Sequence, residues 1–219
     1  MKELFIVANW KSNKNLIQAK DWVERFTNYD LRFTNKDVVI CPSFVHLSVL
    51  KSYISDYKSN IKLGAQDISP FDNGAYTGEV CGSQIKEFAD YVIIGHSERR
   101  KYFKEDEEIL RKKVAMAISA NLLPIFCVEN PKMFIPEGVK IVAYEPIEAI
   151  GTGNPDTPEN AEKTASEIKS NLNGIPVLYG GSITSENVKS FTQMQGIDGV
   201  LVGGASLDPL EFSKIVEVS

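Results

Sequence analysis

The feature that most constrains the fold of this chain is a repeated alternation of short apolar runs and longer amphipathic stretches. Each run is almost continuously apolar, as expected for parallel strands that are covered on both faces. The runs, rich in Val and Ile, are Leu4–Ala8, Val38–Cys41, Ile61–Ala65, Tyr91–Gly95, Leu123–Val128, Ile141–Tyr144, Pro176–Tyr179 and Gly199–Val202. We therefore expect an α/β protein built on a parallel sheet.

The stretches between the runs carry helical patterns. In Glu107–Asn121 the apolar residues expected on one face are Ile109, Leu110, Val114, Ala117 and Ile118. In Glu159–Leu172 the apolar residues at helical spacing are Ala161, Ala165, Ile168 and Leu172. Thr157 and Asp208 each precede a proline and a first-turn carboxylate, which is typical of a helix start.

Strands that alternate with helices, without a linker-like tract, predict a single domain over residues 1–219. We expect a closed (β/α)8 barrel, with an open doubly wound sheet as the alternative. The connection between the fifth and sixth runs, Glu129 to Lys140, is only about a dozen residues long. It is too short for a full-length helix, so this crossover is expected to be shortened.

Composition excludes several classes of function. The net charge of −5 disfavours a nucleic acid or an anionic membrane as partner. No apolar stretch is long enough to span a bilayer, and the N-terminus lacks a signal-peptide pattern. Three widely spaced cysteines argue against a disulfide framework and for a reducing, cytoplasmic compartment. With two histidines and no Cys-x-x-Cys pair, no metal site is expected.

Polar residues directly follow several of the runs, where parallel folds place their active sites. Asn9 and Lys11 follow the first run and face the same way on an extended chain. Lys11 could be an electrostatic anchor, a Schiff-base amine or a solvated surface charge. His96 follows the fourth run. A lone histidine is more often structural, but here the N–H groups of a helical turn could lower the pKa of His96 and hold it neutral.

Glu145 follows the sixth run and precedes a Pro-to-Gly segment, which suits a carboxylate covered by a mobile lid. The alternative is an exposed acid on a surface loop, which is how we interpret Glu148. Glycine pairs follow the last two runs, at Gly180-Gly181 and Gly203-Gly204. Such pairs let backbone N–H groups approach an anion, although a single pair often marks only a tight turn.

The segments at the ends of these runs resemble the signature segments of the triosephosphate isomerase family, in the family's order and over the whole chain. They are Ala8–Lys11, Gly64–Asp67 with Tyr76–Glu79, Ile94–Arg100, Ala143–Gly153, Tyr179–Ser182 and Val202–Gly204. The resemblance implies a (β/α)8 barrel of glycolysis and gluconeogenesis. It would interconvert dihydroxyacetone phosphate and D-glyceraldehyde 3-phosphate through an enediolate, with no metal and no cofactor.

The resemblance also implies roles for individual residues. Glu145 matches the family's base, and His96 matches its neutral electrophile. Lys11 matches the cation that offsets the substrate's charge, Asn9 a polar positioning residue, and Glu98 a carboxylate beside the lysine. Asn9 and Lys11 also belong to the expected substrate-binding set. The N–H groups matching the phosphate clamp belong to Gly151, Ser182, Gly203 and Gly204.

The resemblance further implies a homo-oligomer, with a dimer as the first expectation and a tetramer as the alternative. Thr77 matches the residue that reaches a neighbouring subunit near its lysine, and Cys127 is interpreted as a packing residue beside the base. Three features depart from the family's usual pattern. Residues 127–130 read Cys-Val-Glu-Asn, the following crossover is trimmed as in shortened archaeal forms, and Glu148 stands where the lid usually has Trp.

Two rival functions remain at this stage. Another phosphate-binding barrel enzyme, using a Schiff base or pyridoxal phosphate, would share the glycine pairs but would leave Glu145 and His96 unexplained. A non-catalytic barrel would have no reason to combine Asn9, Lys11, His96 and Glu145.

Overall fold

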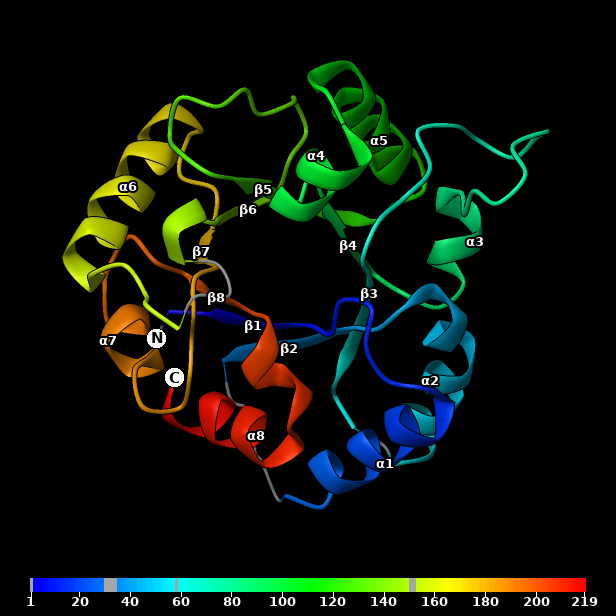
Figure 1. Ribbon diagram of the computed structural model, residues 1–219, viewed down its shortest axis with the longest axis horizontal. Coiled ribbons are helices and arrows are strands. Elements are labelled where there is room, and N and C mark those ends of the chain that lie inside the picture. The colour runs from blue at the N-terminus through cyan, green and yellow to red at the C-terminus, as the bar shows by residue number, and fades with distance from the viewer. Residues whose placement is uncertain (1, 30–34, 58, 150–152) are drawn as a thin grey trace.

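The chain folds into a closed barrel of parallel strands surrounded by helices. The computed structural model describes residues 2–29, 35–57, 59–149 and 153–219. The strands pair in chain order from β1 to β8, and β1 also pairs with β8 to close the ring. In Figure 1 the strands form the inner ring and the helices the outer ring. This confirms the predicted (β/α)8 barrel and excludes the open doubly wound sheet.

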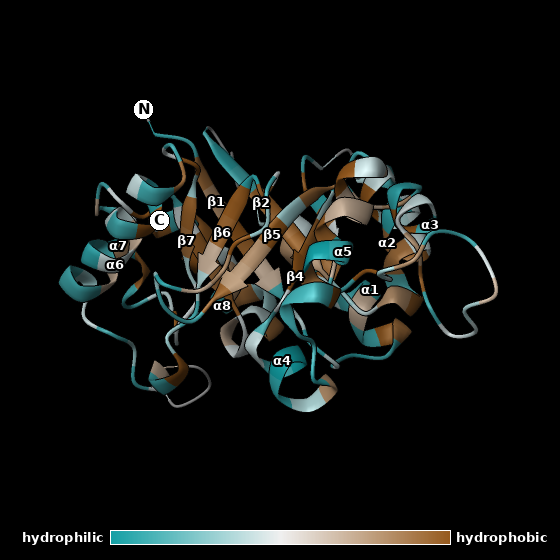
Figure 2. Cartoon of the chain, turned by 90° about the horizontal axis from the view of Figure 1, so that it is seen from above, coloured by the Kyte–Doolittle hydropathy of each residue, from teal (hydrophilic) through white to brown (hydrophobic). Residues whose placement is uncertain are grey.

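The strands lie within a residue or two of the predicted runs. They are β1 (Leu4–Asn9), β2 (Lys36–Cys41), β3 (Lys62–Ala65), β4 (Tyr91–Ile94), β5 (Leu123–Val128), β6 (Ile141–Tyr144), β7 (Val177–Tyr179) and β8 (Gly199–Val202). The hydropathy colours of Figure 2 place these apolar strands at the centre and the hydrophilic residues mainly on the outer helices.

The helices follow the strands. They are α1 (Leu16–Thr27), α2 (Phe44–Asp56), α3 (Gly82–Lys86), α4 (Ser97–Phe103), α5 (Glu107–Ser119), α6 (Pro158–Asn171), α7 (Val188–Thr192) and α8 (Pro209–Val218). Two 3₁₀ turns, η1 (Ile147–Ala149) and η2 (Gly204–Leu207), follow β6 and β8. The expected helix starts are present, because Thr157 caps α6 and Asp208 caps α8 with Pro at the first helical position.

The buried face of α5 differs from the predicted one. Leu110, Val114 and Ala117 are buried as expected, but Ile118 is 41% exposed. Lys113, which a helical pattern would assign to solvent, is 3% exposed instead. Its ammonium group forms ion pairs inside the protein that no local pattern could reveal.

The crossover between β5 and β6 holds no helix. Residues 129–140 form turns and irregular structure, as expected from their small number. Met133 Sδ accepts the Glu129 N–H at 3.1 Å, and the Arg111 guanidinium lies 4.2 Å from the Phe134 ring centroid. Gly138 has a φ of 88°, a left-handed conformation that favours glycine, and it lies against the end of the Ile118 side chain.

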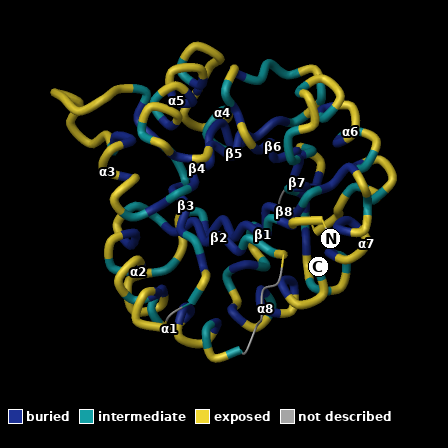
Figure 3. Tube along the Cα trace, turned by 180° about the vertical axis from the view of Figure 1, so that it is seen from behind, coloured by how far each residue is buried: buried dark blue, intermediate teal, exposed yellow. Residues whose placement is uncertain are grey.

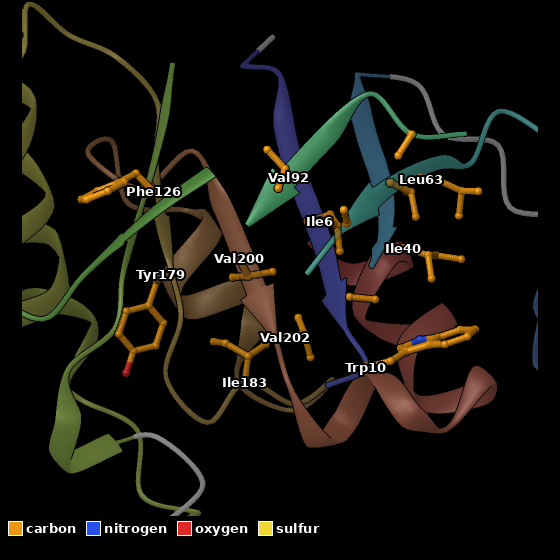
Figure 4. Close-up of a cluster of buried hydrophobic side chains, with 14 of the residues drawn as sticks. Ile6, Trp10, Ile40, Leu63, Val92, Phe126, Tyr179, Ile183, Val200 and Val202 are labelled. Atoms are coloured by element: carbon orange, nitrogen blue, oxygen red, sulfur yellow. The ribbon is translucent and has the colours of Figure 1, made fainter. Parts of the chain in front are cut away.

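Two apolar clusters separate the inside of the barrel from the layer under the helices. Alternate strand residues form the inner cluster, such as Val7, Ala143 and Leu201, and their neighbours form the outer cluster. Figure 4 shows outer-cluster side chains from several strands, and Figure 3 shows the strands as a buried ring within exposed helix surfaces. Within the described ranges, no helix is long and apolar enough to cross a membrane.

Candidate active site

A cavity of about 460 Å³ opens at the carboxyl ends of the strands. The loops that follow β1, β4, β6, β7 and β8 line it. It contains Asn9, Lys11, His96 and Glu145, which lie far apart in the sequence. The structure therefore brings the four predicted catalytic positions to one place.

Asn9 ends β1 in register with the inward-facing Val7 and is 6% exposed. Its Oδ1 accepts the Lys11 N–H at 3.0 Å, while Lys11 has a φ of 52° in the left-handed region. The ammonium Nζ of Lys11 lies 2.6 Å from Glu98 Oε1. Among the described residues that line the cavity, Lys11 is the one Lys or Arg. Its charge therefore faces the cavity while paired with the predicted carboxylate.

Gln66 is a site residue to which the sequence reasoning assigned no role. Its side-chain Nε2 donates to the carbonyl oxygens of Lys11 at 2.9 Å and Cys41 at 2.8 Å. These bonds hold the chain after β1 against the chain after β2. Gln66 lies in the Gly64–Asp67 segment that resembles the family, but the carbonyl groups to which its side chain donates become apparent only in the folded chain.

His96 reaches the site because Gly95 turns the chain after β4. Gly95 has a φ of 72°, which glycine adopts without strain. His96 is the N-cap residue of α4, and its Nδ1 accepts the Glu98 N–H at 3.2 Å. A neutral ring in this position carries its proton on Nε2. That nitrogen lies 3.0 Å from Glu145 Oε1.

Glu145 follows the inward-facing Ala143 on β6 and is 2% exposed. Its backbone N–H donates to the Val128 carbonyl at 2.7 Å, which extends the β5–β6 ladder by one residue. One carboxylate oxygen contacts His96, and the other accepts the Ser97 N–H at 3.2 Å. The surface-loop alternative is therefore wrong for Glu145, whereas Glu148 is exposed as expected.

The pKa of His96 is the point on which the structure corrects the sequence-based expectation. Burial lowers the pKa of His96, but the charge of Glu145 and the hydrogen bond to it outweigh burial and raise the pKa overall. The Glu98 N–H at Nδ1 opposes protonation, because an imidazolium could not accept it. The raised pKa of His96 therefore depends on its contact with Glu145.

Cys127 ends up beside Glu145, inside the barrel. It is 1% exposed and belongs to the inner apolar cluster. Burial, together with the charge of Glu145, raises the pKa of its thiol well above the ordinary value. Such a thiol is a packing group rather than a nucleophile, as expected from the sequence.

The loops after β7 and β8 contribute backbone N–H groups to the lining of the cavity. Within the described part of the chain, the N–H groups of Ser182, Ile183, Gly203 and Gly204 have no acceptor. Cavity-lining N–H groups without acceptors suit an anion. Lys11 Nζ lies 3.9 Å from the point where a Cβ of residue 203 would stand, so its charge adjoins these donors.

Gly151, the remaining expected member of the phosphate clamp, lies outside the described residues. The segments on both sides of it are hydrogen-bonded to the end of β7 and to the loop after it. Ser182 Oγ donates to the Ala149 carbonyl at 2.5 Å, and the Asp156 N–H donates to Tyr179 Oη at 2.8 Å. Within the described ranges, no cluster of three His, Cys, Asp or Glu side chains is arranged to hold a metal ion.

A carboxylate and an imidazole in contact, in a cavity that is also lined by backbone N–H groups suited to an anion, define the chemical class of this molecule. It is a (β/α)8-barrel enzyme built for proton transfer on a small phosphorylated compound. Glycine-bearing loops after strands 7 and 8 are a frequent phosphate site in such barrels.

Comparison with known proteins identifies the family. The family model described as triosephosphate isomerase matches residues 4–138 and 136–219. A triosephosphate isomerase of Thermodesulfovibrio yellowstonii is 40% identical over 249 positions, covering 99% of this chain and 100% of that protein. One of Mesomycoplasma hyopneumoniae (strain 7448) is 38% identical over 243 positions, covering 99% of both. The chain belongs to the triosephosphate isomerase family and is an isomerase.

The same alignments bear on the trimmed crossover. They extend over 243 and 249 positions although this chain has 219 residues, so the relatives contain residues that this chain lacks. The two segments matched by the family model meet at residues 136–138, within the crossover between β5 and β6. The chain therefore keeps the family's barrel with fewer residues than these relatives, and the family model divides at its short β5–β6 crossover.

Proposed function

We propose that the chain interconverts dihydroxyacetone phosphate and D-glyceraldehyde 3-phosphate, with Glu145 as base and His96 as electrophile. The observation that carries this proposal is the 3.0 Å contact between His96 Nε2 and Glu145 Oε1 at the cavity wall. A carboxylate and an imidazole N–H that meet at one point can act on neighbouring atoms of one small substrate.

The reaction needs no partner beyond the substrate. Glu145 takes a proton from the hydroxymethyl carbon, the C–H electrons form the C=C bond, and the carbonyl electrons move onto oxygen. The His96 Nε2–H donates a hydrogen bond to that oxygen and stabilises the enediolate. The hydroxyl proton then moves between the two substrate oxygens, and Glu145 returns its proton to the adjacent carbon. Bonds and charges balance without a cofactor.

Glu145 must change partners to act. Its carboxylate accepts the Ser97 N–H at 3.2 Å and contacts His96 at 3.0 Å. Substrate would replace these contacts and bring the carboxylate against a C–H bond. The loss of the His96 contact removes the attraction that raises the pKa of His96, so the imidazole stays neutral when it is needed as a donor.

Lys11 and Asn9 would bind the substrate between the two ends of the cavity. Lys11 supplies the positive charge that an anionic substrate needs in a chain of net charge −5. Glu98 holds the ammonium group at 2.6 Å and so fixes its position. The N–H groups of Gly151, Ser182, Gly203 and Gly204 would bind the phosphate, supported for the last three by their open donor capacity.

We propose that the chain forms a homo-oligomer through the loop between β3 and α3. This loop extends away from the barrel in Figures 1 and 3. It carries Phe71 and Tyr76, which stack with ring centroids 4.2 Å apart and are 40% and 44% exposed. A stacked aromatic pair on a projecting loop is typical of an interface. Thr77 would lie in that interface, in a dimer or a tetramer.

Two broader features of the protein are also proposed. Residues 1–219 form one domain, because the β1–β8 pairing joins the two ends of the sequence. The compartment is the reducing cytoplasm, supported by Cys41, Cys81 and Cys127, which are free thiols.

A coupled assay tests the reaction directly. The purified protein should convert either triose phosphate into the other, and activity should survive treatment with a chelator. A folded sample without turnover would refute the proposal and favour a non-catalytic barrel. Strict dependence on a metal ion or on pyridoxal phosphate would indicate a different phosphate-binding enzyme.

A further inference from the structure

The loop between β7 and α7 contains a side chain that the proposed reaction does not use. Asn187 lines the cavity beside Ser182, Ile183 and Thr184. Both polar groups of its carboxamide form hydrogen bonds with the backbone of this loop. Its Nδ2 donates to the Ser182 carbonyl at 3.0 Å, and its Oδ1 accepts the Thr184 N–H at 2.9 Å.

The turn that Asn187 holds has an unfavourable backbone. Ser182 has a φ of 42°, in the left-handed region that residues with a Cβ rarely adopt. Such a conformation costs on the order of 1–2 kcal/mol and persists only where surrounding contacts hold it. The Ser182 carbonyl oxygen is held by the hydrogen bond from Asn187 Nδ2.

Holding that carbonyl also sets the direction of two donors. The Ser182 carbonyl and the Ile183 N–H belong to one planar peptide unit, so they point in opposite directions. The φ and ψ of Ser182 together set the direction of the Ser182 N–H relative to this peptide unit. Both N–H groups lack an acceptor within the described residues, and both residues line the cavity.

We propose that Asn187 is a positioning residue for phosphate binding, which fixes the Ser182–Ile183 peptide so that its neighbouring N–H groups face the anion. The inference rests on the proposed phosphate clamp and adds a residue to it that would not itself touch the substrate. The alternative is that Asn187 only stabilises the start of α7 through its hydrogen bond with Thr184. Because the carboxamide makes one bond to Ser182 and another to Thr184, variants that affect these bonds differently can distinguish the two hypotheses.

Two variants distinguish the two hypotheses. Asn187→Ala removes the hydrogen bonds to both Ser182 and Thr184. The double variant Glu186→Gln/Asn187→Asp keeps an acceptor for the Thr184 N–H but has no donor for the Ser182 carbonyl. Glu186 also lines the cavity, so the pair of changes keeps the net charge of this loop constant. Asn171→Ala, at the exposed end of α6, is the matched control.

The measurement is the dissociation constant of inorganic phosphate by titration calorimetry, together with KM and kcat. Both Asn187 variants should bind phosphate about tenfold more weakly, the effect of weakening one hydrogen bond to a charged group. KM should rise in parallel while kcat changes much less, and the double variant should melt close to the wild type. Asn171→Ala should bind phosphate like the wild type.

The outcomes distinguish this inference from the function on which it rests. A double variant that is folded and binds phosphate as tightly as the wild type overturns the role of Asn187 and leaves the proposed reaction intact. A lower melting temperature with unchanged phosphate affinity has the same meaning. A wild-type protein that does not bind phosphate overturns the clamp, and the role of Asn187 with it.

Discussion

Replacing Lys113 by methionine removes one charge from a group of four charged side chains, of which Lys113 and Glu105 are buried while Asp67 and Arg99 are 14% and 27% exposed. Lys113 Nζ lies 2.6 Å from both Asp67 Oδ1 and Glu105 Oε1. Arg99 contacts the same two carboxylates, at 2.8 Å and 2.6 Å. The side chains of Lys113 and Glu105 are each 4% exposed. Methionine is unbranched and one atom shorter than lysine, and it leaves the Arg99 cation alone to balance the carboxylates of Asp67 and Glu105.

The expected cost follows from burial. Removing one partner of a buried ion pair costs about 3–5 kcal/mol, because the remaining charge stays without compensation. Arg99 still contacts both carboxylates, so we expect a value near the lower end, about 3 kcal/mol. For a chain of this length, that corresponds to a fall in melting temperature of about 6–12 °C.

The neighbouring residue supplies the control. Lys112 pairs with Glu108 at 2.7 Å, but the two side chains are 52% and 76% exposed. An exposed pair contributes little to stability, so Lys112→Met should melt close to the wild type. Circular dichroism follows urea unfolding for the free energy and thermal unfolding for the melting temperature, both at one protein concentration because assembly affects the midpoint.

The pH dependence of the stability loss provides a second test. Burial raises the pKa of Asp67, while the charge of Lys113 lowers it. Without Lys113 that pKa rises further, so the folded variant binds a proton more readily than the unfolded chain. The contribution of Asp67 to the stability of the variant is then complete below the unfolded pKa and is lost as pH rises through the raised folded pKa, so the deficit relative to the wild type should be larger at pH 8 than at pH 5. Equal losses in Lys113→Met and Lys112→Met would refute the reasoning.

Three further predictions concern the site and the assembly. Glu145→Gln should lower the pKa of His96, because His96 stays buried but loses the attraction of the Glu145 charge. NMR titration of the two histidine side chains measures this pKa, and an unchanged value would contradict the prediction. The His96 contribution to stability should be complete below its unfolded pKa and be lost as pH rises through the raised folded pKa. Glu145→Gln should lower kcat by roughly 10²–10⁴. Glu148→Gln is the control, and an equal loss of kcat in that variant would mean that Glu145 is not the base. Light scattering should detect an oligomer, and a fully active monomer would contradict the role of Thr77.

Much of the barrel follows from local patterns. Continuous apolar runs place the strands, because a parallel strand is covered on both faces. The alternation within each strand then points Asn9 and Glu145 inward, in register with Val7 and Ala143. The short crossover follows from counting residues between two runs. Eight strands of this kind, each followed by polar or glycine-rich residues, also place the site at the carboxyl ends.

The tertiary structure decided those features that depend on contacts between distant segments. Lys113 is buried because Asp67, 46 residues away, and Glu105 meet its charge, which no helical pattern on α5 can indicate. The pKa of His96 is raised because β4 and β6 bring Glu145 against it, although the turn at α4 was predicted to lower it. Local sequence specifies which residues face inward, but the charge state of a buried group depends on its neighbours in space, and only the folded chain selects them.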